Sequence, residues 1–329
     1  ERHQLFLEPE GLHTNEIYVQ GMSTSLPTDV QEAFLTTIPG LEHARIMRPG
    51  YAIEYDCLDP LQLAPTLAVK GVAGLYSAGQ SNGTSGYEEA AAQGLIAGIN
   101  AARAIAGEEP LILRRSDGYI GVLIDDLVTK GTDEPYRMMT SRAEYRLILR
   151  QDNADLRLTP MGRAAHLVTD ERWTRFIAKR DAIEAALALL KERRLSPSAE
   201  TEARLAEAGI SPLRVPMTLF ALLAREGDYR RLAALFDLPA LADDVREEVE
   251  IMARYDGYLR KQEEQIARME RLESCRIPAT IDYAAISSLR LEAAEKLAAI
   301  RPHSIGQAAR ISGVSPADIS VLLVYLEKQ

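Results

Sequence analysis

A glycine-rich turn carries the clearest chemical signal in this chain. Glycines stand at positions 74, 79, 83 and 86, where they allow positive φ angles and a close backbone approach that a Cβ atom would block. The apolar run Leu75–Ala78 predicts a strand before the turn, and a helix is expected to begin near Tyr87. A helix start presents unpaired N–H groups and a positive dipole end, so the turn is a candidate site for phosphate or another electron-rich group. No complete G-x-G-x-x-G is present, and an ordinary strand-to-helix connection stays open as the alternative.

An arginine-rich segment is the second candidate. Residues 136–163 contain six arginines, no lysine and three acidic residues, although the whole chain has a net charge of −10. Ser141 and Glu144 have the spacing of a capping box, which predicts a helix with three arginines on one face: Arg142, Arg146 and Arg150. The arginine fork binds phosphate oxygens in a bidentate manner, so this face is a candidate phosphate ladder. The alternative is a solvated face whose arginines pair with Glu144 and nearby aspartates.

Longer strings link these two segments to one family. Residues 78–94 read AGQSNGTSGYEEAAAQG, which resembles the turn over the flavin end of FAD in glutathione-reductase-type flavoproteins. The string is closest to the version in the MnmG (GidA) family of tRNA wobble-uridine modifying flavoenzymes. Further strings that resemble this family follow in family order at residues 8–11, 48–56, 134–138, 140–146, 152–159 and 304–310.

The resemblance implies roles for particular residues. The flavin end of FAD would be contacted by Gly79, Gln80, Asn82, Gly83, Thr84, Ser85, Gly86 and Tyr87. The phosphates of tRNA would be held by Arg137, Arg142, Arg146 and Arg150. The complete enzyme would be a cytoplasmic homodimer that uses FAD, NADH and a reduced-folate one-carbon donor together with the GTPase MnmE.

Two family features do not occur in this sequence. The FAD fingerprint and the proposed catalytic cysteine segment of the family precede the position that matches Glu1. The resemblance therefore implies that the chain is the C-terminal half of such a protein and holds no catalytic residue. We expect this piece alone to be inactive and to bind no FAD tightly.

The composition changes along the chain. Residues 1–106 show short β-like runs at 4–7, 17–19, 51–55 and 75–78, with helices expected after Pro27 and Gly86. From about residue 110 onward helical periodicity dominates, and Thr159-Pro160 predicts a helix start. With the resemblance, we expect the α/β portion of a two-dinucleotide-binding, glutathione-reductase-like flavoprotein followed by an all-α helical domain. The expected domains are 1–106, an arginine-bearing helical domain at 107–240, and a long helix with a C-terminal subdomain at 241–329.

One helix of unusual length is expected from Ala242 to about Ser274, with an apolar seam along it. The candidate covers of this seam are the chain's own helical bundle, a second copy and MnmE, of which the bundle is favoured. Pro302 then breaks the pattern. The segment from Ser304 onward is expected to form a small unit that moves independently, and the resemblance assigns it to docking of MnmE.

A rival interpretation places DNA binding at this end. Residues 305–320 have the spacing of a helix-turn-helix, which would make the chain a nucleic-acid-binding module without catalysis. The expected recognition helix, 316–327, carries Asp318 and Glu327 and no cation. It lacks the side chains that contact phosphates and guanine, so sequence-specific DNA binding is disfavoured.

Cysteine usage and hydropathy exclude several classes of protein. Cys57 and Cys275 lie far apart without a C-x-x-C, and the five histidines are scattered, so neither a disulfide framework nor a metal site is expected. Both cysteines are expected to be reduced packing residues. The sequence contains no apolar run of transmembrane length and no signal pattern at its start.

Overall fold

The computed structural model describes residues 3–327, and its chain divides after Asp56 into two compact units. In the first unit, β1 (Phe6–Pro9) and β2 (Ile17–Gln20) pair as an antiparallel hairpin, with Leu7 opposite Val19. This confirms both predicted strands. Helix α1 (Thr28–Leu35) follows Pro27 as expected.

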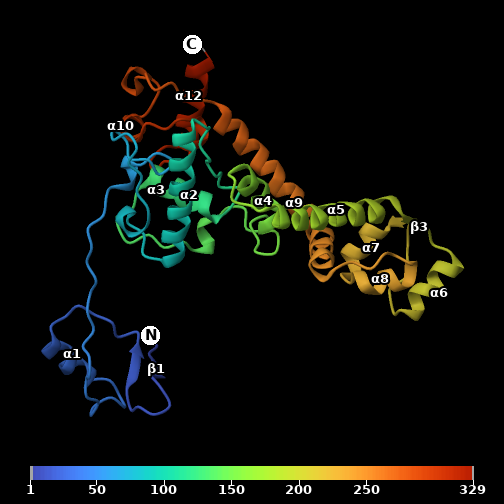
Figure 1. Ribbon diagram of the computed structural model, residues 1–329, viewed down its shortest axis with the longest axis horizontal. Helices are drawn as coiled ribbons and strands as arrows, with labels where there is room; N and C mark the ends of the chain where they lie inside the picture. The colour runs from blue at the N-terminus through green and yellow to red at the C-terminus, as the bar shows by residue number, and fades with distance from the viewer. Residues whose placement is uncertain (1–2, 328–329) are drawn as a thin grey trace. The chain divides into compact units, whose positions relative to one another are not determined.

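The second unit, from Cys57 onward, is built mainly of helices (Figure 1). Its elements are η1 (Pro60–Gln62), η2 (Gly79–Asn82), α2 (Tyr87–Ala106), α3 (Tyr119–Lys130), η3 (Thr140–Arg142), α4 (Ala154–Ala164), α5 (Asp170–Glu192), β3 (Arg194–Leu195), α6 (Ala199–Glu207), β4 (Met217–Thr218), α7 (Leu219–Glu226), α8 (Tyr229–Phe236), α9 (Asp243–Ser274), η4 (Tyr283–Ala285), α10 (Leu291–Ile300), α11 (Ile305–Ala308) and α12 (Pro316–Glu327). The all-helical C-terminal region is thereby confirmed, apart from the two-residue ladder of β3 and β4.

Two predicted strands do not form. Residues 51–55 are extended without a ladder partner, and Leu75–Ala78 makes only an isolated bridge between Tyr76 and Ala68. A strand needs a neighbour along its edge, and within residues 3–327 the sheets are the two short pairs β1–β2 and β3–β4. The predicted dinucleotide-binding sheet is therefore not seen in the described part of the chain.

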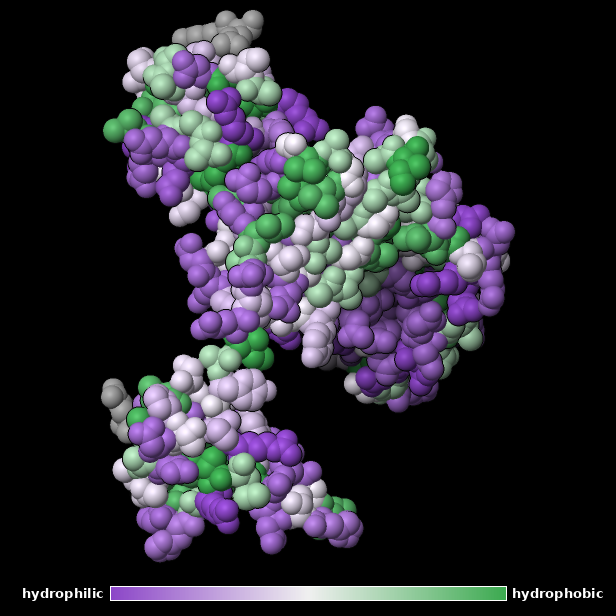
Figure 2. Space-filling model, turned by 60° about the vertical axis from the view of Figure 1, so that its left-hand side comes forward, coloured by the Kyte–Doolittle hydropathy of each residue, from purple (hydrophilic) through white to green (hydrophobic). Residues whose placement is uncertain are grey.

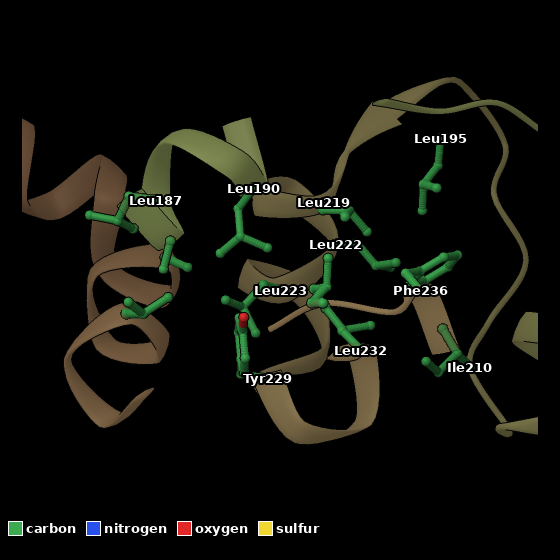
Figure 3. Packing of buried hydrophobic residues seen from close by; sticks show 14 of the residues in the cluster. Leu187, Leu190, Leu195, Ile210, Leu219, Leu222, Leu223, Tyr229, Leu232 and Phe236 are labelled. Atoms are coloured by element: carbon green, nitrogen blue, oxygen red, sulfur yellow. The ribbon is translucent and has the colours of Figure 1, made fainter. Parts of the chain in front are cut away.

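The largest apolar core lies among α5, α7, α8 and the first half of α9. Figure 3 shows Leu190, Leu222, Leu223 and Leu232 pointing toward one another from these helices, with the Tyr229 ring beside them. A second cluster joins the end of α9 to α10, α11 and α12. Helix α9 therefore connects two cores, and its predicted bounds and its burial by the bundle at the Val245 end are confirmed.

Helix α2 has apolar residues on both of its sides. Ile96 and Ala97 are buried against Leu63 and Leu67. On its solvent side Leu95 and Ile105 are exposed. Figure 2, in which the left-hand side of Figure 1 faces the viewer, shows pale and green residues gathered on this side of the unit. Helix α2 thus packs one apolar face into the unit and leaves a few apolar side chains exposed on the other.

The predicted helix start at Thr159-Pro160 is wrong. Pro160 lies inside α4, which begins after Asn153. The Asn153 side chain accepts a hydrogen bond from Arg157 and donates one to the Ile148 carbonyl, which holds the first turn in place ahead of the proline.

Candidate cofactor turn and nucleic-acid interface

The glycine-rich turn is a short 3-10 helix, η2, that ends at a left-handed glycine. Gly79 has a φ of +84° and Gly83 a φ of +79°, a region that favours glycine. A Cβ atom at Gly86 would lie 1.7 Å from a carboxylate oxygen of Glu89 and 2.0 Å from a guanidinium nitrogen of Arg137. The backbone path therefore favours glycine at 79 and 83, and at 86 a larger residue would displace the Glu89 and Arg137 side chains.

Gln93, which the sequence interpretation did not single out, is the hub of this turn. Its amide oxygen accepts hydrogen bonds from the Gly79 N–H at 3.2 Å and from the Asn82 amide at 2.8 Å. Its NH₂ group donates to the Thr84 hydroxyl at 3.0 Å. It lies two turns into α2 and faces back toward the glycines, and no spacing pattern in the sequence indicates this role. A fully buried glutamine thus fixes the shape of the turn.

The predicted turn residues fall into two groups. Five of them are buried: Gly79, Asn82, Gly83, Thr84 and Gly86. The remaining three are exposed: Gln80, Ser85 and Tyr87. No side-chain cap is made at the start of α2. The Asn82 Oδ1 atom is buried without a hydrogen-bond partner among the described residues. An uncapped helix start and an open acceptor fit a turn whose backbone receives an electron-rich ligand with its own hydrogen donors.

The turn is held against the segment around Tyr136. The Tyr136 N–H donates to the Gly83 carbonyl at 2.8 Å, and the Ser85 N–H donates to the Tyr136 carbonyl at 3.0 Å. The buried Glu89 carboxylate accepts a hydrogen bond from the Met138 N–H at 2.7 Å and lies 3.5 Å from Arg137. The structure thus brings Arg137 next to the predicted cofactor residues.

A charge cluster centred on the buried Arg115 contacts the segment around Tyr136. Arg115 lies 2.8 Å from Asp126, 3.0 Å from Asp125 and 2.9 Å from Glu144. The Tyr136 hydroxyl donates to Asp126 at 2.8 Å. Burial, followed by the charge of Asp126, raises the pKa of Tyr136 well above its usual range, so this hydroxyl stays a hydrogen-bond donor.

The predicted arginine helix does not form. Residues 140–142 make a single 3-10 turn, η3, and turns follow it. Glu144, the expected capping partner of Ser141, instead binds Arg115. The arginine-rich loop, residues 136–150, therefore presents its arginines separately and not as a ladder.

Each arginine of this loop has different surroundings. Arg142 donates to the Arg137 carbonyl at 2.9 Å, and its guanidinium lies 4.2 Å from the centre of the Tyr136 ring. Arg150 is held by Asp152 at 2.8 Å and by Glu248 at 2.7 Å. Arg146 is exposed and has no ion-pair partner within residues 3–327. The alternative of a solvated face is met only in part: Arg150 does pair with an aspartate, but it is mostly buried and is also held by the buried Glu248.

Glu248 makes the stability of this region depend on pH. Burial, followed by the neighbouring Asp152 carboxyl, raises the pKa of Glu248 to about 7. The folded state then binds more protons than the unfolded state from about pH 4.5 to 7, so stability falls as the pH rises through that range. Glu248→Gln keeps the neutral form, and we expect its melting temperature to exceed that of the wild type by more at pH 8 than at pH 5.

Thermal melts at both pH values measure this effect. Glu247→Gln, at the neighbouring exposed position of α9, is the matched control and should leave the difference between pH 5 and pH 8 unchanged. Identical behaviour of the two variants would show that Glu248 is ionised throughout.

The two cysteines differ from each other. Cys275 packs against the second core, as predicted. Cys57 is exposed, so its prediction as a packing residue is wrong. It follows directly on the first unit, in a stretch without regular structure, where no core is near enough to cover it.

The C-terminal end is tied to the rest of its unit. Arg310 makes a bidentate pair with Asp125 of α3, with both distances 2.7 Å. Ile305, Ile319 and Leu322 lie in the same buried cluster as residues 277–297. The expectation that the segment from Ser304 moves independently is therefore wrong, because its removal would open this core.

The helix-turn-helix interpretation finds little support in this geometry. Helix α11 has only four residues, and Asp318 in the first turn of α12 is buried and paired with Arg290 at 2.6 Å. Among residues 3–327, no group of three histidine, cysteine or acidic side chains could hold a metal ion. The same residues include no helix of the length and hydropathy needed to cross a bilayer.

Sequence comparisons match three parts of the chain to one family. Residues 1–109 match "Glucose inhibited division protein A", residues 170–263 match the "tRNA modifying enzyme MnmG/GidA C-terminal helical domain", and residues 265–329 match its C-terminal helical bundle. The chain belongs to the MnmG/GidA family. The last match assigns the supposed helix-turn-helix to the helical bundle of MnmG/GidA proteins.

Individual relatives are similar over the whole chain. The tRNA uridine 5-carboxymethylaminomethyl modification enzyme MnmG of Clostridium kluyveri is 59% identical over 100% of this chain and 53% of that relative. The enzyme of the same name from Listeria welshimeri is 57% identical over 99% of this chain and 52% of its own length. Aquifex aeolicus GidA in its form II crystal superposes with a TM-score of 0.80 at 45% identity, over 99% of this chain and 52% of that one. The chain thus spans about half the length of the MnmG relatives it matches.

Proposed function

We propose that this chain is the C-terminal part of an enzyme that helps install a carboxymethylaminomethyl group at C5 of the wobble uridine of tRNA. The observation that carries the proposal is the similarity to MnmG enzymes over the full chain, at 59% identity with the Clostridium kluyveri relative. FAD and NADH as cofactors, MnmE as partner, a homodimer and a cytoplasmic location belong to this proposal.

The glycine-rich turn would hold the flavin end of FAD, which supplies the redox chemistry when it is bound. The backbone of Gly79, Gly83 and Gly86 would approach the ligand closely. The exposed side chains of Gln80, Ser85 and Tyr87 would contact it, and the buried Thr84 would keep the turn in shape. The uncapped start of α2 supports this assignment, because its positive dipole end stabilises negative charge on a nearby group. The buried Asn82 Oδ1 would accept a hydrogen bond from the ligand.

The arginine-rich loop would contact tRNA phosphates. Arg137, Arg142 and Arg146 are exposed and keep donors available. Arg150 would contribute only where phosphate replaces Asp152 and Glu248 as its partner. Because Arg137 and Arg142 flank Tyr136, whose backbone is bonded to the turn, phosphate contacts would form beside the cofactor residues.

Replacing either of two glutamines by alanine, in the longer protein that contains this chain, tests the cofactor site. Gln80→Ala should weaken FAD binding by about 0.5–1.5 kcal/mol, the range of one hydrogen bond, and leave the melting temperature of the apoprotein unchanged. Gln93→Ala should weaken FAD binding and also destabilise the apoprotein by about 1–3 kcal/mol, because the buried Gly79 N–H loses its acceptor. Flavin titration, thermal melts and nucleoside analysis of tRNA provide the readouts.

Gln151→Ala, on the exposed surface of the neighbouring loop, is the control for both variants. Unchanged FAD affinity in Gln80→Ala would remove Gln80 from the site. A longer protein that neither binds FAD nor alters wobble uridine would refute the proposed function.

A further inference from the structure

The cations of α9 are distributed unevenly around the helix. Near the middle of the helix Arg260 pairs with Asp256 at 2.9 Å. In contrast, none of four further cations has a carboxylate within ion-pair distance among residues 3–327: Arg254, Lys261, Arg268 and Arg271. In a chain with a net charge of −10, such a run of cations without acidic partners needs an explanation.

Three of these cations share one face with a tyrosine and a glutamine. Steps of four and three residues bring side chains to the same side of a helix. The α9 stripe defined by this spacing is Arg254, Tyr258, Lys261, Gln265 and Arg268, and all five residues are exposed. It extends for about 21 Å along the helix, and its cations repeat about every 10 Å.

The Tyr258 ring makes the stripe more than a solvated charged face. Tyr258 is 63% exposed, although it stands one turn from Arg254 and one turn from Lys261. An exposed aromatic ring between cations is the arrangement with which proteins bind single-stranded nucleic acid, since bases stack on the ring while cations meet the phosphates. The Gln265 amide adds a hydrogen-bond donor for a phosphate or a ribose hydroxyl.

The charge around the stripe agrees with an anionic partner. Glu264 lies three residues after Lys261 and four before Arg268, and it makes no ion pair with either; Glu250, four residues before Arg254, pairs with Arg246 at 3.7 Å. Glu263 and Glu270 line a cavity of about 280 Å³ on another side of α9, together with Arg114 and Arg157. Glu263 and Glu270 therefore lie away from the stripe, whereas Glu264 is its acidic neighbour at Lys261 and Arg268.

We propose that the α9 stripe binds an RNA strand, with Lys261 and Arg268 on phosphates and Tyr258 stacked on a base. The inference rests on the proposed function only in naming tRNA as the RNA. It deepens that function, because a second contact surface on α9 compensates for the dispersed arginines of residues 136–150.

Filter binding of unfractionated tRNA to this chain across salt concentrations tests the proposal. Replacing Lys261 and Arg268 together by glutamine should weaken binding and reduce the log-log salt slope by about 1.4–1.8, since each lost phosphate contact counts about 0.7–0.9. Tyr258→Ala should weaken binding by about 5- to 160-fold with an unchanged slope, while Tyr258→Phe keeps the ring and the affinity. Glu264→Gln should tighten binding, because it removes the acidic neighbour.

Replacement of Arg172 and Lys296 by glutamine is the matched control, with the same change of net charge at exposed positions of α5 and α10 that also lack acidic partners within residues 3–327. Circular dichroism melts verify that each variant folds. Equal salt slopes for the stripe variant and the control, or full affinity in Tyr258→Ala, would overturn the proposal.

Competition separates RNA from an acidic protein partner. Poly-L-glutamate should displace tRNA from the chain far less well than RNA of equal charge does, and equal displacement would overturn the assignment to RNA. A chain that binds no RNA at all would also overturn it. The proposed function is judged separately, by wobble-uridine analysis with the longer protein.

Discussion

Arg115→Met is expected to destabilise the protein by about 3–5 kcal/mol, because breaking a buried ion pair from one side leaves an uncompensated charge. Arg115 is only 8% exposed and is surrounded by three carboxylates, of which that of Asp126 is almost completely buried. Lys130 would still meet Asp126, but among residues 3–327 no other cation lies within ion-pair distance of Glu144. Urea unfolding of the wild type and the variant measures the loss.

The exposed Arg175 provides the control for this experiment. It pairs with Glu171 on the surface of α5 at 3.0 Å, and Arg175→Met should cost less than about 1 kcal/mol. If both substitutions cost equally little, then Asp125 and Asp126 are neutralised by Arg310 and Lys130 alone, and Arg115 is not the centre of the cluster.

Gly121→Ala is expected to have the second largest effect. A Cβ atom at Gly121 would lie 2.1 Å from the Arg114 carbonyl oxygen and 2.7 Å from its carbon, and both are backbone atoms. Helix α3 would have to move away from residues 113–115, where Arg115 enters the charge cluster. Overpacking of this kind costs about 1–3 kcal/mol, and a contact with backbone places it at or above the upper end.

Gly98→Ala is the comparison, because Gly98 lies inside α2 and nothing stands within 4 Å of its missing Cβ. The same substitution there should stabilise this chain by up to about 1 kcal/mol through helix propensity. A melting temperature of Gly121→Ala that equals or exceeds that of the wild type, as expected for Gly98→Ala, would show that the clash at Gly121 is relieved without cost.

The sequence predicted the helices and turns whose formation depends on residues close together in the chain. The glycines before Tyr87, the Pro27 helix start and the apolar period of α9 each determine structure within a few turns of chain, and the structure follows all three. The β1–β2 hairpin also forms where alternating runs flank polar turns.

Tertiary partners decided what the sequence could not show. Glu144 satisfies a capping pattern, but its carboxylate binds Arg115, 29 residues earlier in the chain. It is therefore not available to cap a helix at Ser141, and that helix does not form. Arg150 was expected to face phosphate, yet Glu248 reaches it from α9 across 98 residues. Gln93 became the hub of the cofactor turn because it lies two turns along a helix that folds back on the glycines, which no spacing rule indicates.

Helix α9 also has a mechanical consequence. Its 32 residues form a rod about 48 Å long that is embedded at each end in a different core. A tilt of about 5° at the Val249 end displaces the opposite end by about 4 Å, which exceeds the length of a hydrogen bond. The pair between Arg310 and Asp125 and the bond between Ser304 and Glu273 brace that opposite end. A tilt of α9 therefore acts on α3 through the pair between Arg310 and Asp125, next to Asp126, which holds the Tyr136 hydroxyl.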